Sequence, residues 1–313
     1  MIQTATLENV IDQVHQISAN HYDETIPLQE MEFDSLNQMW VAGKQVEVVP
    51  SAQRLLSNRL RVPFSYLSRC PANLQAENLN YWIEQEAKKR ETFFCRFDGS
   101  DLRGVFSQRY TVLDNMEILS AMLEHGFSPG QEVQYSLDRN MMVVKVPEWN
   151  GAFNVAVKDR LVPGIAFSNS EVGLLCFSVE AFFWRLVCSN GLILAVSAGR
   201  SRFKHISRKA FERFPETVAQ VIEDSGRRRD QFALSNQTTV TSPLATIDAF
   251  NRRFGIGKKE ADAVKLAWEA EPANTMFSVI NAYTRAARRP DLTAEEAYRL
   301  EKTGGLILST VKH

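Results

Sequence analysis

The residues best suited to bind an anion are gathered in one short basic segment. It combines six cationic or titratable side chains with one aromatic ring: Arg200, Arg202, Phe203, Lys204, His205, Arg208 and Lys209. Cations neutralise the phosphates of a nucleic acid, and an aromatic ring stacks on an exposed base. The same pattern is also typical of a solvated helix face. The segment therefore predicts a single-strand binding site, with a structural role as the alternative.

A second candidate for phosphate binding is a glycine pattern between two helical stretches, at 244–253 and 258–268. Glycine occupies every second position and two lysines follow: Phe254, Gly255, Ile256, Gly257, Lys258 and Lys259. This spacing matches helix-hairpin-helix elements, in which glycines permit close backbone approach and the second helix supplies free N–H groups. A plain helical turn explains the same residues. Because the longer gap of a phosphate-binding loop is absent, we predict no ATP hydrolysis.

Arg185 is the third candidate, because it lies in an apolar run where an isolated charge is costly. The spacing of Val179, Phe182 and Phe183 predicts a helix over 179–187 that Asn190-Gly191 ends. An arginine in such a helix either faces a nucleic-acid groove or pairs with a carboxylate, for which Glu171 and Glu180 are the candidates.

No constellation for catalysis stands out. The four cysteines are scattered without a Cys-x-x-Cys pair, and the five histidines give no zinc-ligand spacing. No nucleophile and base, and no carboxylate pair, occurs in a recognisable local motif. The residues therefore favour a protein without metal, cofactor or catalytic activity. Scattered aspartates that converge in space leave a metal-dependent nuclease open as an alternative.

The elements that must position these residues follow from periodicity and turn chemistry. A first helix begins after Thr6, β-prone runs at 92–97 and 102–106 flank the turn Asp98-Gly99-Ser100, and Asp114 with Glu117 has the spacing of a capping box. Four further β-prone runs follow at 132–137, 141–146, 153–157 and 164–167. This order predicts an α+β fold: an antiparallel meander sheet with packed helices and a mostly helical C-terminal region.

The same pattern predicts three regions along the chain. We expect a peripheral N-terminal segment at 1–50, an α+β core at 51–198 and a basic, mostly helical region at 199–313. The longest apolar run is interrupted by Ser178, Glu180 and Arg185, and is too short for a membrane span. The N-terminus lacks the basic start and apolar core of a secretory signal, so we expect a cytoplasmic protein without a membrane partner.

Charge is distributed unevenly between these regions, although the net charge is only -1. Residues 199–313 carry 20 Lys and Arg against 14 Asp and Glu, whereas residues 1–198 carry 16 against 23. A basic third beside an acidic body indicates either a polyanionic partner or contact between oppositely charged surfaces of two subunits. We therefore expect nucleic acid as a partner and a homo-oligomer as the assembly.

Several phrases of the sequence together carry a family resemblance. They are Phe106-Ser107-Gln108-Arg109-Tyr110 running into Asp114-Asn115, Asn169-Ser170-Glu171 with Gly173, Arg185-Leu186-Val187-Cys188-Ser189-Asn190-Gly191, and Asn281-Ala282-Tyr283-Thr284 with Leu300-Glu301. In combination they resemble the phage and plasmid-like family known as domain of unknown function 932, over roughly residues 50–308. The resemblance implies a mobile-element context and supplies no catalytic residues. The hairpin, helix and meander are also similar to single-strand annealing proteins, by analogy of fold alone.

These features predict a nucleic-acid-binding protein of a mobile element that binds single-stranded DNA or anneals it in recombination. The alternative is an anti-restriction or regulatory protein that docks onto a partner through its acidic body, whose candidate residues are Asp23, Glu24, Glu30, Glu32 and Asp34. A metal-dependent enzyme acting on nucleic acid is the third and least favoured hypothesis.

Overall fold

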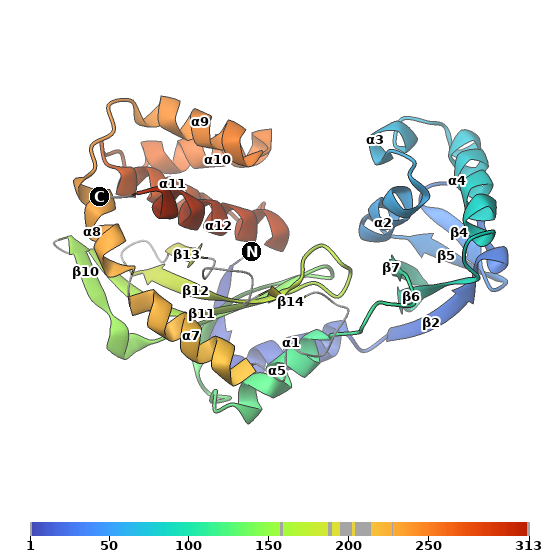
Figure 1. Cartoon of the computed structure of the whole chain (residues 1–313), viewed down its shortest axis with the longest axis horizontal. Coiled ribbons are helices and arrows are strands. Elements are labelled where there is room, and N and C mark those ends of the chain that lie inside the picture. Colours follow the sequence, from blue (N-terminus) through green and yellow to red (C-terminus); the bar gives the residue numbers. More distant parts are fainter. Residues whose placement is uncertain are drawn as a thin grey trace.

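The computed structural model describes residues 2–156, 159–186, 190–194, 202–203, 214–226 and 228–311. These residues form two bodies, each built on a mostly antiparallel sheet that helices cover (Figure 1). We call residues 21–106 the smaller lobe and the other described residues the larger body. The predicted α+β class is confirmed, and so is the predominance of helices in the C-terminal region.

The larger body is organised by an antiparallel sheet. Its strands run in the order β1 (Gln3–Thr6), β8 (Glu132–Leu137), β9 (Met142–Pro147), β11 (Asp159–Asn169), β12 (Phe177–Arg185) and β13 (Asn190–Leu194), while β10 (Phe153–Ala156) pairs with β11 and β14 (Arg202–Phe203) pairs with β12. Strands β8, β9, β11, β12 and β13 are antiparallel neighbours in chain order, and β10 pairs with β11. The predicted meander is therefore confirmed.

Helices pack on both faces of this sheet (Figure 1). One face is covered by α1 (Leu7–Ile17), α5 (Asn115–Glu124) and α7 (Phe214–Gly226), and the other by α8 (Arg229–Gln237), α11 (Met276–Ala286) and α12 (Ala294–Thr310). Helices α9 (Pro243–Phe254) and α10 (Lys258–Glu269) pack on α11. Within the described part of the chain, no helix is both long enough and apolar enough to cross a membrane.

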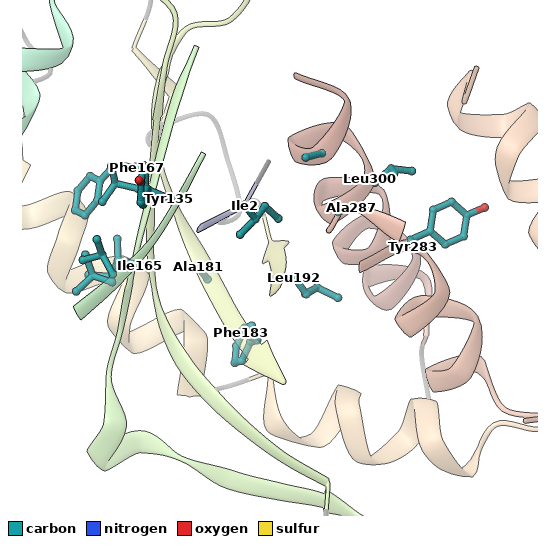
Figure 2. Close-up of a cluster of buried hydrophobic side chains, with 14 of the residues drawn as sticks. Ile2, Tyr135, Ile165, Phe167, Ala181, Phe183, Leu192, Tyr283, Ala287 and Leu300 are labelled. Atoms are coloured by element: carbon teal, nitrogen blue, oxygen red, sulfur yellow. The ribbon is translucent and has the colours of Figure 1, made fainter. Parts of the chain in front are cut away.

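Apolar side chains from the sheet and the helices share one core. Figure 2 shows Phe167 and Phe183 from the strands, with Tyr283 and Leu300 from α11 and α12, all of them fully or almost fully buried. Burying a large apolar side chain stabilises a fold by about 1.5 to 3 kcal/mol. This shared core fixes the C-terminal helices against the sheet.

The smaller lobe has a six-stranded sheet and a core of its own. Its elements are β2 (His21–Pro27), β3 (Met31–Phe33), β4 (Gln38–Val41), β5 (Lys44–Val48), α2 (Pro50–Leu60), α3 (Phe64–Leu67), α4 (Ala72–Ala87), β6 (Thr92–Asp98) and β7 (Asp101–Phe106). The predicted hairpin is confirmed as β6 and β7, and Gly99 in its turn has a φ of 57°, which favours glycine.

The first 50 residues contribute to both bodies. They supply β1 to the larger sheet and β2 to β5 to the smaller one, and Leu7, Val10 and Val14 are buried in the larger core. The smaller lobe occupies the chain between α1 and α5, which contact each other. The boundaries at 50 and 198 stay predictions.

One predicted helix is wrong. Residues 177–185 form strand β12 and residues 190–194 form strand β13, where the sequence spacing predicts a helix and its terminator. Every residue of β12 is buried, because helices cover both faces of the sheet. A strand buried on both faces carries apolar side chains at successive positions, and such a run imitates helical spacing.

The predicted capping box of α5 does not form either. Asp114 stands at the N-cap, but its side chain makes no capping hydrogen bond. Instead its Oδ1 accepts a hydrogen bond of 2.5 Å from Nη2 of Arg96. The first amide of the helix, at Asn115, donates to Oε1 of Glu171 at 2.8 Å. A carboxylate distant in sequence thus accepts the first amide of the helix, and a local sequence motif cannot reveal such a partner.

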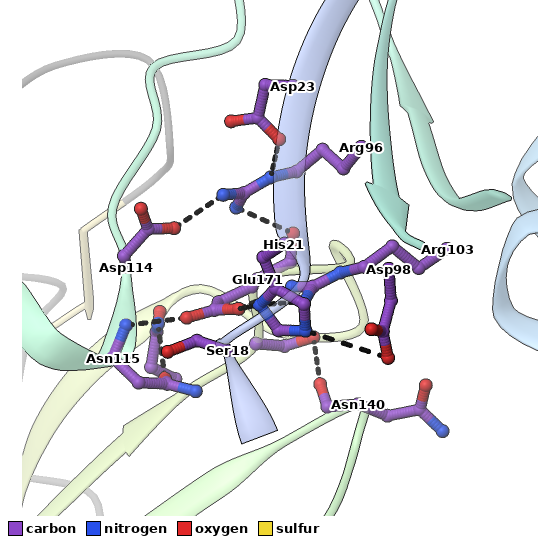
Figure 3. A network of polar contacts seen from close by, with 12 residues as sticks. Ser18, His21, Asp23, Arg96, Asp98, Arg103, Asp114, Asn115, Asn140 and Glu171 are labelled. Carbon is purple, nitrogen blue, oxygen red and sulfur yellow. Dashed lines mark hydrogen bonds and ion pairs between the residues drawn. The ribbon is translucent and has the colours of Figure 1, made fainter. Parts of the chain in front are cut away.

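Two buried arginines join the smaller lobe to the larger body. In β6, Phe93 and Cys95 face the core of the lobe, so alternation places Arg96 on the opposite face, and Arg103 of β7 lies there too. Arg103 donates to the carboxylate of Glu171, and Arg96 donates to the Glu171 carbonyl at 3.2 Å (Figure 3). Glu171 therefore holds both arginines. We call this group the junction.

Removing the Glu171 carboxylate is expected to be costly. Glu171→Ala leaves Arg103 buried without its partner and should lower the free energy of unfolding by about 3 to 5 kcal/mol. Urea denaturation of the variant and of wild type measures this difference. Glu32→Ala, at an exposed position of β3, serves as the control and should change the stability by less than about 0.5 kcal/mol. Equal losses in both variants would contradict the role of Glu171.

His21 should make the junction sensitive to pH. Burial and the Arg103 guanidinium lower the pKa of His21 below its ordinary value of 6.5, against the opposing effect of Glu171 and Asp98. As the pH falls below about 6.5, the unfolded chain binds a proton more readily than the folded chain, so stability is lost. Urea midpoints at pH 7.5 and 5.5 should differ more for wild type than for His21→Gln. An identical pH dependence in the two proteins would argue against this assignment.

Candidate functional site

The basic segment lies mostly outside the described residues. Of its seven members only Arg202 and Phe203 are described, and only as the backbone of β14, where they pair with Ser178 and Phe177 of β12. Arg200, Lys204, His205, Arg208 and Lys209 lie outside the described residues. Phosphate binding and base stacking by this segment stay predictions.

The predicted pair of helices around the glycines is confirmed as α9 and α10. Gly255 ends α9 in the left-handed region with a φ of 64°, and its amide donates to the carbonyl of Arg252. Gly257 is the N-cap of α10. Both glycines and the two lysines that follow are exposed. The sequence thus folds locally as the pattern predicts.

Two groups of this hairpin that could bind a phosphate, the Gly257 amide and the Lys259 ammonium group, already have partners. The amide of Gly257 donates to Oε2 of Glu260 at 3.2 Å, and Arg299 holds that carboxylate at 2.7 Å. Lys259 donates to Glu296 at 3.0 Å. A phosphate at this end of α10 would meet a fixed carboxylate, whereas Lys258 is exposed with no ion pair among the described residues. The geometry therefore favours a structural turn over a complete phosphate site.

Arg185 lies in strand β12, and its carboxylate partners differ from those that the sequence suggests. Its guanidinium donates two hydrogen bonds to Asp159, both 2.7 Å, and two to Glu271, of 3.0 and 2.7 Å. Glu171 and Glu180, the predicted partners, bind Arg103 and Lys302 instead. The expected ion pairing is present, but the proposed partners are wrong, because the pairing of β11 with β12 and the segment after α10 bring Asp159 and Glu271 to Arg185 instead.

A basic groove lies where the chain leaves the smaller lobe, and the sequence patterns did not predict it. Four cations line this hollow of about 660 Å³: Arg59, Lys89, Arg90 and Arg109. They come from the end of α2, the turn before β6 and the chain after β7. Thr92, Ser107 and Gln108 add polar groups, and Glu91 is the one carboxylate among the lining residues. Glu86, which does not line the groove, is ion-paired with Lys89 at 3.7 Å and with Arg90 at 2.6 Å, so the groove presents an excess of positive charge that is partly neutralised.

Two cations of the groove, Arg59 and Arg90, repel each other. The guanidinium groups of Arg59 and Arg90 lie 5.6 and 5.7 Å from the centroid of the same ring, Phe93. Burial and the charge of Arg90 lower the pKa of Arg59, although Glu86 opposes this. Nε of Arg59 donates to the Val105 carbonyl at 2.9 Å, which fixes its orientation. An anion bound here would relieve the repulsion.

The quoted phrases of the sequence meet at two places in the structure. Tyr110, Asn115, Asn169 and Glu171 converge at the junction, where Nδ2 of Asn169 donates to Oδ1 of Asn115 at 2.9 Å. From the later phrases, Gly191 and Glu301 meet between the sheet and α12, where a Cβ at Gly191 would lie 2.6 Å from Oε1 of Glu301. Most of these residues therefore build the fold. Ser107, Gln108 and Arg109, which belong to the first quoted phrase, line the groove. That phrase is the feature of the sequence that could have indicated the groove.

In the part of the chain that the structure describes, no group of three or more His, Cys, Asp or Glu side chains is arranged to hold a metal ion. A family model described as Domain of unknown function (DUF932) matches residues 103–303. This range covers the larger body from the end of the smaller lobe onward. No curated protein and no solved structure matches the chain.

Proposed function

We propose that this chain, which belongs to the family described as Domain of unknown function (DUF932), binds single-stranded nucleic acid through its basic groove. The observation that carries the proposal is the convergence of Arg59, Lys89, Arg90 and Arg109 on one hollow with a single carboxylate. Phosphates neutralised by lysine and arginine supply most of the affinity in sequence-tolerant binding. We further propose single-stranded DNA of a mobile element as the ligand, and strand annealing in recombination as the role.

Exposed aromatic rings on the same lobe support single strands over duplex. Tyr66, Tyr81 and Trp82 are 45%, 55% and 40% exposed. Trp82 lies one turn before Glu86 on the same face of α4, and Glu86 is bonded to Arg90 of the groove at 2.6 Å. Bases that are unpaired stack on such rings, whereas paired bases cannot reach them.

The groove is tested by measuring affinity as a function of salt. Fluorescence anisotropy of labelled single-stranded and duplex oligonucleotides compares wild type with Arg90→Gln/Arg109→Gln. On single strands each phosphate contact contributes about 0.7 to the slope of log K against log salt. The double variant should therefore bind roughly 10- to 30-fold more weakly at about 0.1 M salt, with a shallower salt dependence.

A matched control removes the same charge from the same lobe. Arg54 and Arg69 are exposed and do not line the groove, so Arg54→Gln/Arg69→Gln should bind like wild type. If wild type shows no binding at low salt, or if the two double variants weaken binding equally, the groove is not the site.

The basic segment and the oligomer are tested beside the groove. Arg200→Glu/Arg202→Glu/Lys204→Glu weakens binding if the predicted segment forms part of the same surface. We also propose self-association, which light scattering coupled to size-exclusion chromatography measures directly. A monomer that binds normally would remove oligomerisation from the proposal and leave the groove intact.

The alternative function keeps one specific observation in its favour. Glu24, Glu30, Glu32 and Asp34 are exposed, whereas Asp23 is bonded to Arg96 at 2.9 Å. These acidic residues lie on or beside β2 and β3, the two edge strands of the smaller sheet. An acidic docking surface would lose its protein partner when they are neutralised, while oligonucleotide binding would stay as in wild type.

A further inference from the structure

A small polar pocket lies in the larger body, remote in sequence from the groove. It has a volume of about 170 Å³ and is lined by residues of β11, β12, α8, α10, α11 and the segment between α10 and α11. Arg185 and Phe277 lie in its wall and are both at least nine-tenths buried. The volume is below the range for drug-sized ligands, so a single small ring system is the appropriate scale.

Among the described residues that line the pocket, the charges are balanced. Asp159 and Glu271 carry negative charge, while Arg185 and Arg285 carry positive charge. Both carboxylates are bonded to Arg185, and Arg285 reaches Glu271 at the longer distance of 3.4 Å. A phosphate would meet two carboxylates, and a cation would meet two guanidinium groups. The pocket therefore favours a ligand without net charge.

One buried polar group of the wall, the Ser278 hydroxyl, lacks a partner among the described residues. The hydroxyl of Ser278 is buried, with only 8% of the residue exposed, and has no hydrogen-bond partner among the described residues. The side-chain amides of Asn236 and Asn281 line the same pocket, and none of their hydrogen bonds is recorded within the described part of the chain. Leaving a buried hydroxyl unpaired costs about 1 to 3 kcal/mol. A ligand that hydrogen-bonds to it would recover this energy.

We propose that this pocket binds a nucleobase. A base is uncharged, presents N–H donors and carbonyl or ring-nitrogen acceptors on its edges, and has two flat apolar faces. The amides and the hydroxyl match the edges, and Phe277, Ala267 and Ala282 provide apolar wall. A sugar of the same size would cover this apolar wall with hydroxyl groups. The base comes either from a free nucleoside or from an unpaired position of the strand, and the second source rests on the proposed function.

Nucleosides without phosphate separate this pocket from the groove. Saturation-transfer NMR with cytidine, uridine, adenosine and guanosine should show transfer to at least one of them with wild type. Ser278→Ala should weaken that binding about tenfold, the scale of one hydrogen bond. In the absence of ligand the same variant should raise the urea midpoint, because it removes an unpaired buried hydroxyl. Ser65→Ala, at an exposed position of α3, should change neither quantity.

The outcomes distinguish the two proposals. Absence of transfer from all four nucleosides, or equal transfer with wild type and Ser278→Ala, overturns the pocket and leaves oligonucleotide binding by the groove unaffected. Arg90→Gln/Arg109→Gln should lose oligonucleotide affinity and keep nucleoside binding. The loss of affinity caused by abasic sites, compared between wild type and Ser278→Ala, identifies the source: a smaller loss in the variant indicates a base of the strand, and an equal loss indicates a free nucleoside.

Discussion

Glu171 sets the relation between the two bodies. Its carboxylate accepts hydrogen bonds from Arg103 of the smaller lobe and from the first amide of α5 in the larger body. Its backbone carbonyl accepts hydrogen bonds from Arg96 and Tyr110. Charged groups that are buried together hold their places because separating them would leave each one desolvated and unpaired. The loop after β11 therefore governs how the smaller lobe is held.

Patterns within one element were readable from the sequence, and contacts between elements were not. The hairpin of β6 and β7 follows from alternating apolar residues and a glycine turn, and the pair of helices around Gly255 follows from local spacing. Asp114 shows the limit. Its position at the start of a helix was predictable, but its carboxylate accepts a hydrogen bond from Arg96, which lies in a strand of the other body. The prediction for the residues of β12 was wrong for a related reason, because the burial of both faces of this strand depends on helices far along the chain.

The groove and the pocket share this limit. Arg59, Arg90 and Arg109 are separated by intervals that match no helical or strand repeat, so only the folded lobe brings them onto one hollow. Arg185 was recognisable as a charge in need of a partner, yet Asp159 and Glu271 reach it from a neighbouring strand and from the end of α10. A sequence shows that a buried charge needs a partner more readily than it shows which residue provides that partner.

The chain enters the smaller lobe after α1 and leaves it before α5, and these two helices pack together on the larger sheet. The family match begins at Arg103, in the last strand of the lobe. Topologically the lobe is an insertion in a loop of a continuous framework. Because α1 and α5 contact each other, the chain enters and leaves the lobe at neighbouring points of the larger body.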